Sequence, residues 1–187
     1  MRKSFGVKPA IYPEPVFIIA AYDKDGTPHC MNAAWGGLVA KTQLMLCLNP
    51  AHKTVIALRE SGAFTVSVGQ ADQVVACDYV GITSGNNVSD KFARAGFHAT
   101  KSEFVNAPMI DELAYTLECE LVSYDDDSHI LIAEIKNISV DEAVLDTEGN
   151  VDVAKLAPIS FDPNTKKYYQ IGDVVADARS VGKQLQE

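Results

Sequence analysis

Residues 15–34, PVFIIAAYDKDGTPHCMNAA, carry the pattern that decides the fold of this chain. The run from 15 to 22 is rich in β-forming side chains, and the Lys-Asp-Gly at 24–26 that follows it is a turn signal. Residues 27–34 are therefore predicted to return as the second strand of an antiparallel hairpin.

Short segments of the same kind recur along the rest of the chain. We expect further strands at 44–48, 63–68 (half-buried), 115–124 paired with 129–140 as a long hairpin, 157–161 and 168–171. Helices are predicted at 54–59, from Asp72 onward, at 89–96, and in the polar tail 173–187. Many short strands with a few inserted helices favour a mainly β protein, an antiparallel β-barrel, over alternating βαβ units.

Two carboxylates, Glu118 and Glu120, flank Cys119 on the strand predicted at 115–124. Because side chains alternate along a strand, both are expected on its solvent face. They are therefore not interpreted as a catalytic acid–base pair, and no catalytic residue is assigned.

Length and composition indicate one globular domain over residues 1–187, with an N-terminal arm (1–12) and a C-terminal tail (173–187). The net charge of −9 argues against nucleic acid or an anionic membrane as a partner, since both reward a basic face. No apolar run approaches the roughly 20 residues that span a bilayer. The first run, 15–22, is too short for a signal peptide of the usual design, so a cytoplasmic protein is expected.

The cysteines and histidines show no metal-binding pattern. No C-x-x-C pair and no H-x-x-x-H spacing occurs, so no metal site is predicted. The cysteines are interpreted as small core residues in a reducing compartment, with a structural zinc or a catalytic thiol as the alternatives: Cys30, Cys47, Cys77 and Cys119. Neither G-x-G-x-x-G nor a Walker sequence is present, which disfavours a Rossmann domain or a P-loop.

Two short motifs indicate a ligand. The first, Asn32-Ala33-Ala34-Trp35, offers an amide, small residues and the chain's single tryptophan. The second, Asn49-Pro50-Ala51-His52-Lys53-Thr54, offers two potential cations and a hydroxyl at the start of a predicted helix. A flat aromatic ligand that ends in a phosphate needs such a set: a slot for the ring and donors for the anion.

Each of these residues also has a purely structural interpretation. Thr54 either caps its helix or binds phosphate together with the helix N–H groups. Trp35 is either a core residue or, among small neighbours, a wall of a ring site. Asn32 is either a turn residue or a hydrogen-bonding partner of the ring.

The order of several motifs resembles the flavin reductase-like proteins with an FMN-binding split barrel, and specifically their flavoredoxin-like branch. In chain order these motifs are a Pro-Val strand, D-x-D-G, N-A-A-W, H-K-T, D-Y-x-G-I-x-S-G, D-K-F-A, A-P-M-I, L-E-C-E-L and a late Y-Y. The similarity runs from about residue 13 to about residue 182, nearly the whole chain.

The resemblance implies a six-stranded antiparallel split barrel of Greek-key type, a homodimer, and FMN bound without covalent attachment near the dimer interface. The matching cofactor positions are Asn32 and Trp35, with the phosphate taken by Thr54 and its neighbours His52 and Lys53, followed by Ser84, Gly85, Lys91, His129 and Phe161. Structural alternatives remain for three of them: a solvated charge for Lys91, an exposed turn residue for His129, and a core residue for Phe161, as for Tyr168.

The chain departs from the family pattern in one place. Relatives that reduce free flavin often carry an S-x-x-P-P-type loop, where this chain has Ala40-Lys41-Thr42-Gln43-Leu44. The departure favours tight retention of FMN over a dedicated free-flavin reductase.

The resulting hypothesis is a cytoplasmic FMN-binding oxidoreductase or electron-transfer protein. Its donor or acceptor is a small molecule, with NAD(P)H as the candidate donor, or a protein; FMN is favoured over FAD because the site ends in a phosphate. A non-catalytic flavin-binding or storage module is the alternative from another class. A pyridoxamine-phosphate-oxidase-like enzyme is a third, although the sequence shows no basic cluster for a second phosphate.

Overall fold

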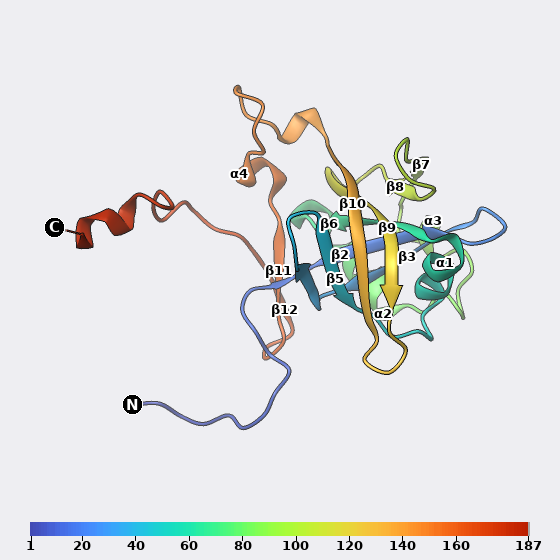
Figure 1. Ribbon diagram of the computed structural model, residues 1–187, viewed down its shortest axis with the longest axis horizontal. Coiled ribbons are helices and arrows are strands. Elements are labelled where there is room, and N and C mark those ends of the chain that lie inside the picture. Colours follow the sequence, from blue (N-terminus) through green and yellow to red (C-terminus); the bar gives the residue numbers. More distant parts are fainter. Residues whose placement is uncertain (187) are drawn as a thin grey trace.

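The computed structural model describes residues 1–186 and shows a curled antiparallel sheet with helices at its end and side (Figure 1). The elements in chain order are β1 (Glu14–Pro15), β2 (Phe17–Tyr22), β3 (Pro28–Ala33), β4 (Gly36–Leu38), β5 (Gln43–Cys47), α1 (Lys53–Ser61), β6 (Ala63–Val68), η1 (Ala71–Gln73), α2 (Val74–Ile82), α3 (Lys91–Arg94), β7 (Ala99–Lys101), β8 (Pro108–Ile110), β9 (Tyr115–Tyr124), β10 (Ile130–Val140), η2 (Glu142–Val144), α4 (Val153–Leu156), β11 (Ile159–Asp162), β12 (Lys167–Gln170) and η3 (Val181–Leu185). The predicted strands and the three internal helices are confirmed, with small shifts at their ends.

The main sheet has seven strands in the order β3-β2-β6-β9-β10-β5-β4. These are the six principal strands expected for a split barrel plus the three-residue edge strand β4. The predicted hairpins are confirmed: β2 pairs with β3, with Ile19 opposite Met31, and β9 pairs with β10 along their length. Two bulges interrupt the β9–β10 ladder, which increases its twist and helps the sheet to curl. A separate small sheet, β1-β11-β12, lies beside the barrel.

The core fills both sides of the first strands. One apolar cluster lies inside the curl, where Val55 and Leu58 of α1 pack against the sheet. A second cluster lies between the other face of β2 and β3 and the helices α2 and α3, and it includes Cys77 and Phe92. Ile18 and Ile19, neighbours on β2, are therefore both fully buried, which explains the unbroken apolar run in the sequence.

Strand β6 differs from the half-buried strand predicted at 63–68. Five of its six residues are buried, including the polar Thr65 and Ser67. The segment around β8 covers its second face: the Thr65 hydroxyl donates to the Pro108 carbonyl at 2.6 Å. Ser67 and Thr116 share a second buried hydrogen bond of 2.8 Å, so both polar side chains are satisfied.

The expectation for Glu118 was wrong. Glu120 is exposed, but Glu118 is 0% exposed, because the segment that contains Ser102 lies over this part of the sheet. Its carboxylate accepts hydrogen bonds from the Ser102 hydroxyl, from Ser139 at 2.5 Å and from Asn137 at 2.8 Å. Burial raises the pKa of Glu118, but these hydrogen bonds outweigh it and leave that pKa below its ordinary value.

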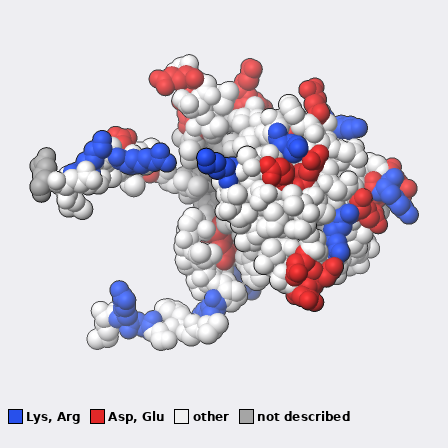
Figure 2. Space-filling view, viewed as in Figure 1, with Lys and Arg blue, Asp and Glu red and all other residues white. Residues whose placement is uncertain are grey.

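The two ends of the chain extend away from the barrel on the side of the small sheet (Figure 1). Both ends carry basic side chains (Figure 2). The terminal helix predicted for 173–187 is wrong in extent, since only the short 3₁₀ segment η3 forms there, and Glu187 lies outside the described residues. Among residues 1–186, no helix has the length and hydropathy needed to cross a bilayer.

Candidate functional site

Three adjoining pockets meet at Asn32, near the end of β3. The polar compartment, about 150 Å³, is lined by Met31, Asn32, His52, Lys53, Thr54, Val80, Gly81, Ile82, Thr83, Ser84, Gly85 and Lys91. The apolar compartment, about 400 Å³, is lined by Val16, Asn32, Ala33, Ala34, Asp78, Gly81, Ile82, Phe161, Lys166 and Tyr168. The tryptophan compartment, about 230 Å³, is lined by Met31, Asn32, Ala33, Ala34, Trp35, Cys47, Leu48, Asn49 and His52. The two sequence motifs thus lie in one cleft.

The start of α1 forms the floor of the polar compartment. His52 is the N-cap residue and makes no side-chain capping bond, while Thr54 is the second residue of the helix. The capping interpretation of Thr54 is therefore wrong, and its hydroxyl makes no hydrogen bond within residues 1–186. The first-turn N–H groups, from Lys53 to Val55, also find no acceptor among the described residues, so the helix presents free donors to the compartment.

A charged cluster lies at the side of this helix start. The Lys53 Nζ is 3.6 Å from Asp23 Oδ2, which also accepts a 2.9 Å hydrogen bond from His29 Nε2. This bond from His29, helped by backbone N–H groups, lowers the pKa of Asp23 to about 2. Lys53 is about one third exposed, so its remaining N–H groups are available to an anion in the compartment.

The loop after α2 closes the other side of the polar compartment. A Cβ at Gly85 would lie 3.2 Å from the Lys53 Cβ, so a larger residue there would push the loop away from the helix. Asn86 Nδ2 donates to the Ala51 carbonyl at 3.0 Å and ties the loop to the α1 start. Ser84 is exposed and presents its hydroxyl at the mouth of the compartment.

Lys91 is a buried cation, so the solvated-charge interpretation is wrong. Its side chain is 6% exposed, and Nζ donates to the carbonyls of Val80 at 3.1 Å and Thr83 at 3.0 Å. These bonds cover the last carbonyls of α2 and place the positive charge at the wall of the polar compartment. Burial lowers the pKa of Lys91. Burial, and then the charge of Lys91, lower the pKa of His52.

Asn32 joins the compartments and fixes α2 against β3. Its Nδ2 donates to the Cys77 carbonyl at 3.0 Å, whereas its Oδ1 makes no hydrogen bond within residues 1–186. A Cβ at Gly81 would lie only 3.0 Å from the Asn32 Cβ, so glycine permits this close approach. Asn32 is therefore a strand residue that faces the cleft, and the turn interpretation is wrong.

The apolar compartment is closed by the small sheet. Phe161 of β11 and Tyr168 of β12 pack with their ring centroids 5.6 Å apart, and the Tyr168 hydroxyl donates to Asp78 Oδ1 at 2.8 Å. Ala33 and Ala34 also line this compartment. Phe161 is half-buried, so it is available to a ligand as well as to the core.

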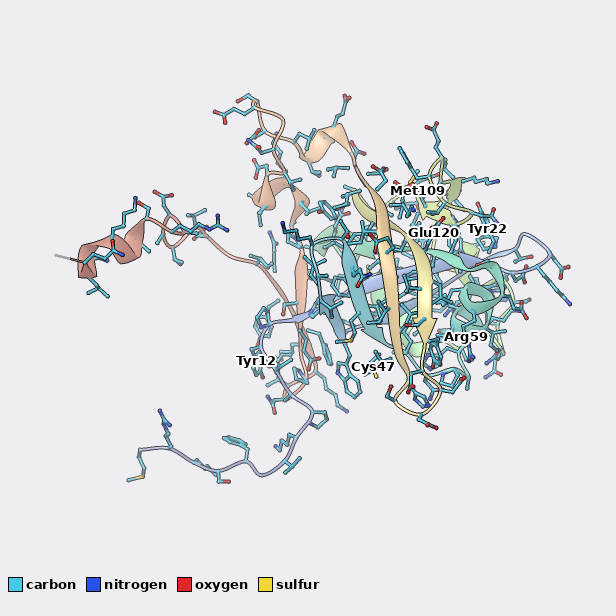
Figure 3. The ribbon with its side chains drawn as sticks, viewed as in Figure 1. Tyr12, Tyr22, Cys47, Arg59, Met109 and Glu120 are labelled. Atoms are coloured by element: carbon cyan, nitrogen blue, oxygen red, sulfur yellow. The ribbon has the colours of Figure 1, made fainter. Side chains whose placement is uncertain are left out.

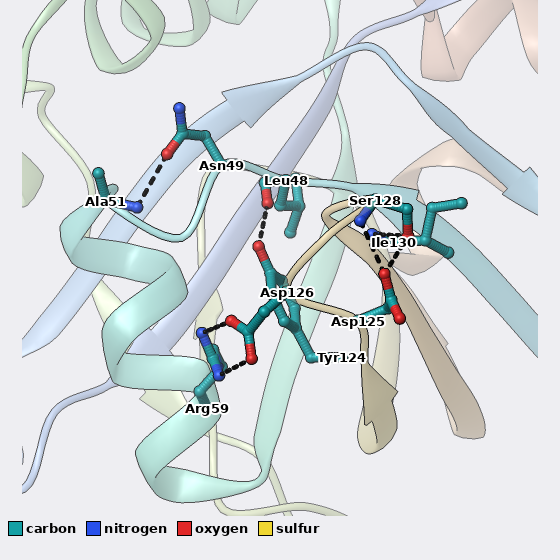
Figure 4. Close-up of polar contacts among 9 residues, drawn as sticks. All are labelled: Leu48, Asn49, Ala51, Arg59, Tyr124, Asp125, Asp126, Ser128 and Ile130. Atoms are coloured by element: carbon teal, nitrogen blue, oxygen red, sulfur yellow. Dashed lines mark hydrogen bonds and ion pairs between the residues drawn. The ribbon is translucent and has the colours of Figure 1, made fainter.

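The tryptophan compartment contains Trp35, for which the interpretation as a core residue is wrong. Trp35 is 52% exposed and lines this compartment. Asn49 shapes the turn into α1, because its Oδ1 accepts from the Ala51 N–H at 2.9 Å (Figure 4). Cys47 is half-buried, at the same end of the barrel as Arg59 (Figure 3), and its side chain lines the compartment. The other three cysteines are buried, and burial raises the pKa of Cys30 and Cys119 to about 12.

His129 lines none of the three compartments within this chain. It has a positive φ of 60° at the end of the β9–β10 turn, and its carbonyl accepts from the Leu48 N–H at 2.9 Å. Arg59 of α1 holds this turn through a paired contact with Asp126 at 2.9 and 3.2 Å (Figure 4). The cofactor role that the resemblance implies for His129 is therefore not explained by the geometry of one chain.

The comparison with known families decides the membership of the chain. The model of the flavin reductase like domain matches residues 10–163. The chain belongs to this family. Flavoredoxin of Desulfovibrio vulgaris (Miyazaki F) is 36% identical and superposes with a TM-score of 0.92 over 98% of this chain and 100% of that one.

Two further proteins extend the comparison. Flavoredoxin from Methanosarcina acetivorans is 27% identical, with a TM-score of 0.87 over 98% of this chain and 100% of that one. An uncharacterised protein of Aquifex aeolicus (strain VF5) is 36% identical over 72 residues, which are 37% of this chain and 37% of that protein. The alignment thus spans little more than a third of the Aquifex protein, whereas the flavoredoxins match throughout. The flavin reductase-like split barrel is the fold of this chain, and its family supports a flavin-related redox role.

Sequence reasoning missed several residues of this flavin reductase-like cleft, chiefly Asp78, Gly81, Ile82 and Lys166. The first three lie at i, i+3 and i+4 on α2 and so share one helix face. That spacing was visible in the sequence, but nothing local indicated that this face borders the cleft.

The cleft fits a flavin mononucleotide by the chemistry of its walls. Free helix N–H groups, Lys53 and Lys91 suit a phosphate, and they would hold it in the polar compartment. The adjoining apolar compartment is lined by small residues and by Phe161, which suits a flat ring. Among residues 1–186, no group of three or more His, Cys, Asp or Glu side chains is placed to hold a metal ion.

Proposed function

We propose that this protein binds FMN without a covalent link and acts as a flavin-dependent oxidoreductase or electron-transfer protein. The observation that carries the proposal is the junction at Asn32: a compartment of anion donors opens directly into an apolar slot. The phosphate would lie at the α1 start, and the ring would pass Asn32 into the apolar compartment. The single anion site favours FMN over FAD and over a ligand with two separate phosphates.

The residues of the chain divide the binding between them. Thr54 and the free N–H groups of α1 donate to the phosphate, and Lys53 offsets its charge. Asn32 Oδ1, which is free of internal bonds, is placed to accept from the ring. Ala33 and Ala34 allow the backbone to approach the ring closely, and Phe161 excludes water from the compartment.

Bound flavin would supply the electron-transfer chemistry, and the protein would orient it and limit access to it. The cleft is open on the side of Ile82, which is 77% exposed, so a planar donor such as NAD(P)H has room to approach. Buried Cys30, Cys77 and Cys119 are consistent with the reducing conditions of a cytoplasmic setting.

A homodimer is part of the proposal, supported by an apolar opening in the curled sheet. This opening, about 510 Å³, is lined mainly by Phe17, Leu38, Leu44, Val68, Leu117, Ile135 and Ile138. Leu38 is 68% exposed and Ile138 is 44% exposed, and contiguous apolar patches of this kind are typical of protein interfaces. Sedimentation or light scattering of the purified protein tests the dimer directly.

The phosphate site is tested by the double variant Thr54→Ala/Lys53→Ala. We expect FMN to bind at least tenfold more weakly while riboflavin, which lacks the phosphate, binds as before, and far-ultraviolet circular dichroism to be unchanged. Glu60→Ala, an exposed change on the same helix, is the matched control. Equal FMN affinity in the double variant and the wild type would show that the phosphate is held elsewhere.

Redox activity is tested by mixing the FMN-loaded protein with NADH or NADPH without oxygen. Loss of the oxidised flavin absorbance much faster than for free FMN supports a reductase. If neither nucleotide reduces the bound flavin and dithionite does, the donor is another molecule or a protein.

A further inference from the structure

The apolar compartment contains one polar pair that phosphate binding does not use. Tyr168 on β12 donates its hydroxyl to Asp78 Oδ1 on α2 at 2.8 Å. Burial and the hydrogen bond to Asp78 raise the pKa of Tyr168, so the phenol stays neutral. The second oxygen of Asp78 makes no hydrogen bond within residues 1–186, and the residue lines the compartment.

The charge of Asp78 is not neutralised by a neighbouring cation. Within residues 1–186, Asp78 takes part in no ion pair. Lys166 lines the same compartment, but it is an exposed residue of the β11–β12 turn and its amine makes no ion pair in the described structure. The buried cation Lys91 lies at the C-terminal end of α2, where it donates to the carbonyls of Val80 and Thr83.

Side chains of opposite charge therefore line the two compartments: Asp78 of α2 lines the apolar compartment, and Lys91 of α3 lines the polar compartment. Asp78 lies one turn before Gly81, which lines both compartments, whereas the Lys91 amine lies at the C-terminal end of α2 in the polar compartment. Tyr168 fixes the carboxylate from the far side, since its ring packs on Phe161 and its hydroxyl holds Oδ1.

We propose that Asp78, positioned by Tyr168, lowers the reduction potential of the flavin bound in this cleft. The inference rests on the proposed function, because it requires the ring to lie in the apolar compartment. Reduction of a flavin adds negative charge to the ring system, and a fixed carboxylate in a slot of low polarity opposes that charge. Asp78 thus makes the bound cofactor a stronger donor of electrons.

The test is the midpoint potential of the bound flavin in Asp78→Asn, measured by anaerobic reduction against a reference dye. Asparagine keeps the shape and still accepts from the Tyr168 hydroxyl, so only the charge is removed. We expect the equilibrium to shift at least tenfold toward the reduced flavin, which is about 30 mV upward for a two-electron couple. Asp72→Asn, an exposed acid just before α2, is the matched control and is expected to leave the potential unchanged.

Tyr168→Phe separates the charge from a merely structural role. It removes the hydroxyl that shares the negative charge but keeps the ring against Phe161, so the potential should fall or stay constant. If the two substitutions only disturbed the structure, the midpoint potential of the bound flavin would shift in the same direction in both variants. If the charge of Asp78 sets the potential, Asp78→Asn raises it, whereas Tyr168→Phe lowers it or leaves it unchanged. An unchanged or lower potential in Asp78→Asn, at normal FMN content, would overturn the inference and leave the proposed function intact. If the wild-type protein bound no flavin, the proposed function would fail instead.

Discussion

The polar and apolar compartments would hold the proposed flavin by different physical means. The polar compartment offers unpaired helix N–H groups, Lys53 and the buried Lys91, so its contribution depends on the negative charge of the ligand. The apolar compartment offers small side chains, Phe161 and the acidic Asp78, so its contribution depends on ring contact and on the redox state. Under the proposed function, this difference would set affinity mainly at one end of the cleft and electron chemistry at the other.

The sharpest way to break this division is a charge reversal at the polar end. We expect Lys53→Glu to weaken FMN binding about 100-fold, because one or two charge-assisted hydrogen bonds of about 1.5–3 kcal/mol are replaced by repulsion. Riboflavin affinity should stay within twofold of wild type, as measured by titration of flavin fluorescence. Lys101→Glu on the exposed strand β7 is the control. A parallel loss of riboflavin binding would mean that the two ends do not act separately.

A change at the junction should affect both ends at once. A Cβ at Gly81 would lie 3.0 Å from Asn32, so Gly81→Val should push α2 away from β3. Such overpacking costs typically about 1–3 kcal/mol, so the free energy of unfolding should fall by that amount in urea denaturation. FMN and riboflavin should weaken by the same factor. Gly172→Val, where no atom lies within 4 Å of the added Cβ, should change none of these quantities.

A smaller change at the apolar end should differ from the Lys53 variant in that both flavins lose affinity. Phe161→Leu removes an aromatic ring from the lining of the apolar compartment, and an aromatic contact with the ring of a ligand contributes about 0.5–1.5 kcal/mol. FMN and riboflavin are therefore both expected to bind about threefold to tenfold more weakly. Tyr169→Phe, an exposed neighbour of Tyr168 on β12, is the control. If FMN weakened and riboflavin did not, Phe161 would act through the phosphate end.

The floor of the polar compartment could be predicted from the sequence because one short segment, residues 52–54, supplies it. Residues 49–54 follow strand β5, form a turn and start a helix, and the anion donors follow from that local geometry. The strand pattern from 15 to 34 likewise predicted its hairpin, since the side-chain period and the turn residues are local features. The burial of Lys91 could not be predicted from local sequence, because only the folded chain brings its amine to the last carbonyls of α2.

The apolar end could not be predicted in the same way, because four separated segments build it. Val16, Ala33, Asp78 and Phe161 come from separate segments that meet only in the tertiary structure. The prediction that Glu118 is exposed was wrong for the same reason. Alternation gives the face of a strand on which a side chain lies, but it does not show that Ser102 and its loop will cover that face. The prediction of a helix in the tail was wrong because a polar helix needs packing to be stable, and residues 173–186 pack on nothing in the described structure.

The smallest expected effect concerns the stability of the two ends at low pH. Each end has one carboxylate nearby with a strongly lowered pKa. Asp23 pairs with His29 and Lys53 at the polar end, whereas Asp162 follows Phe161 and accepts from the hydroxyls of Thr165 and Tyr12. Hydrogen bonds, first from Thr165 and then from Tyr12, lower the pKa of Asp162 to about 2, from 3.8.

A carboxylate whose pKa is lower in the folded state stabilises that state above its ordinary pKa, and the contribution is lost as the pH falls toward the folded value. Wild type should therefore be more stable than Asp162→Asn at pH 7, and the difference should shrink between about pH 4 and pH 2, as measured by urea denaturation at several pH values. Asp173→Asn in the exposed tail should follow the wild type throughout. A difference that stayed constant down to pH 2 would mean that Asp162 supports the apolar end by its shape and not by its charge. In that case, the acid sensitivity of the cleft would have to come from Asp23 and the polar end.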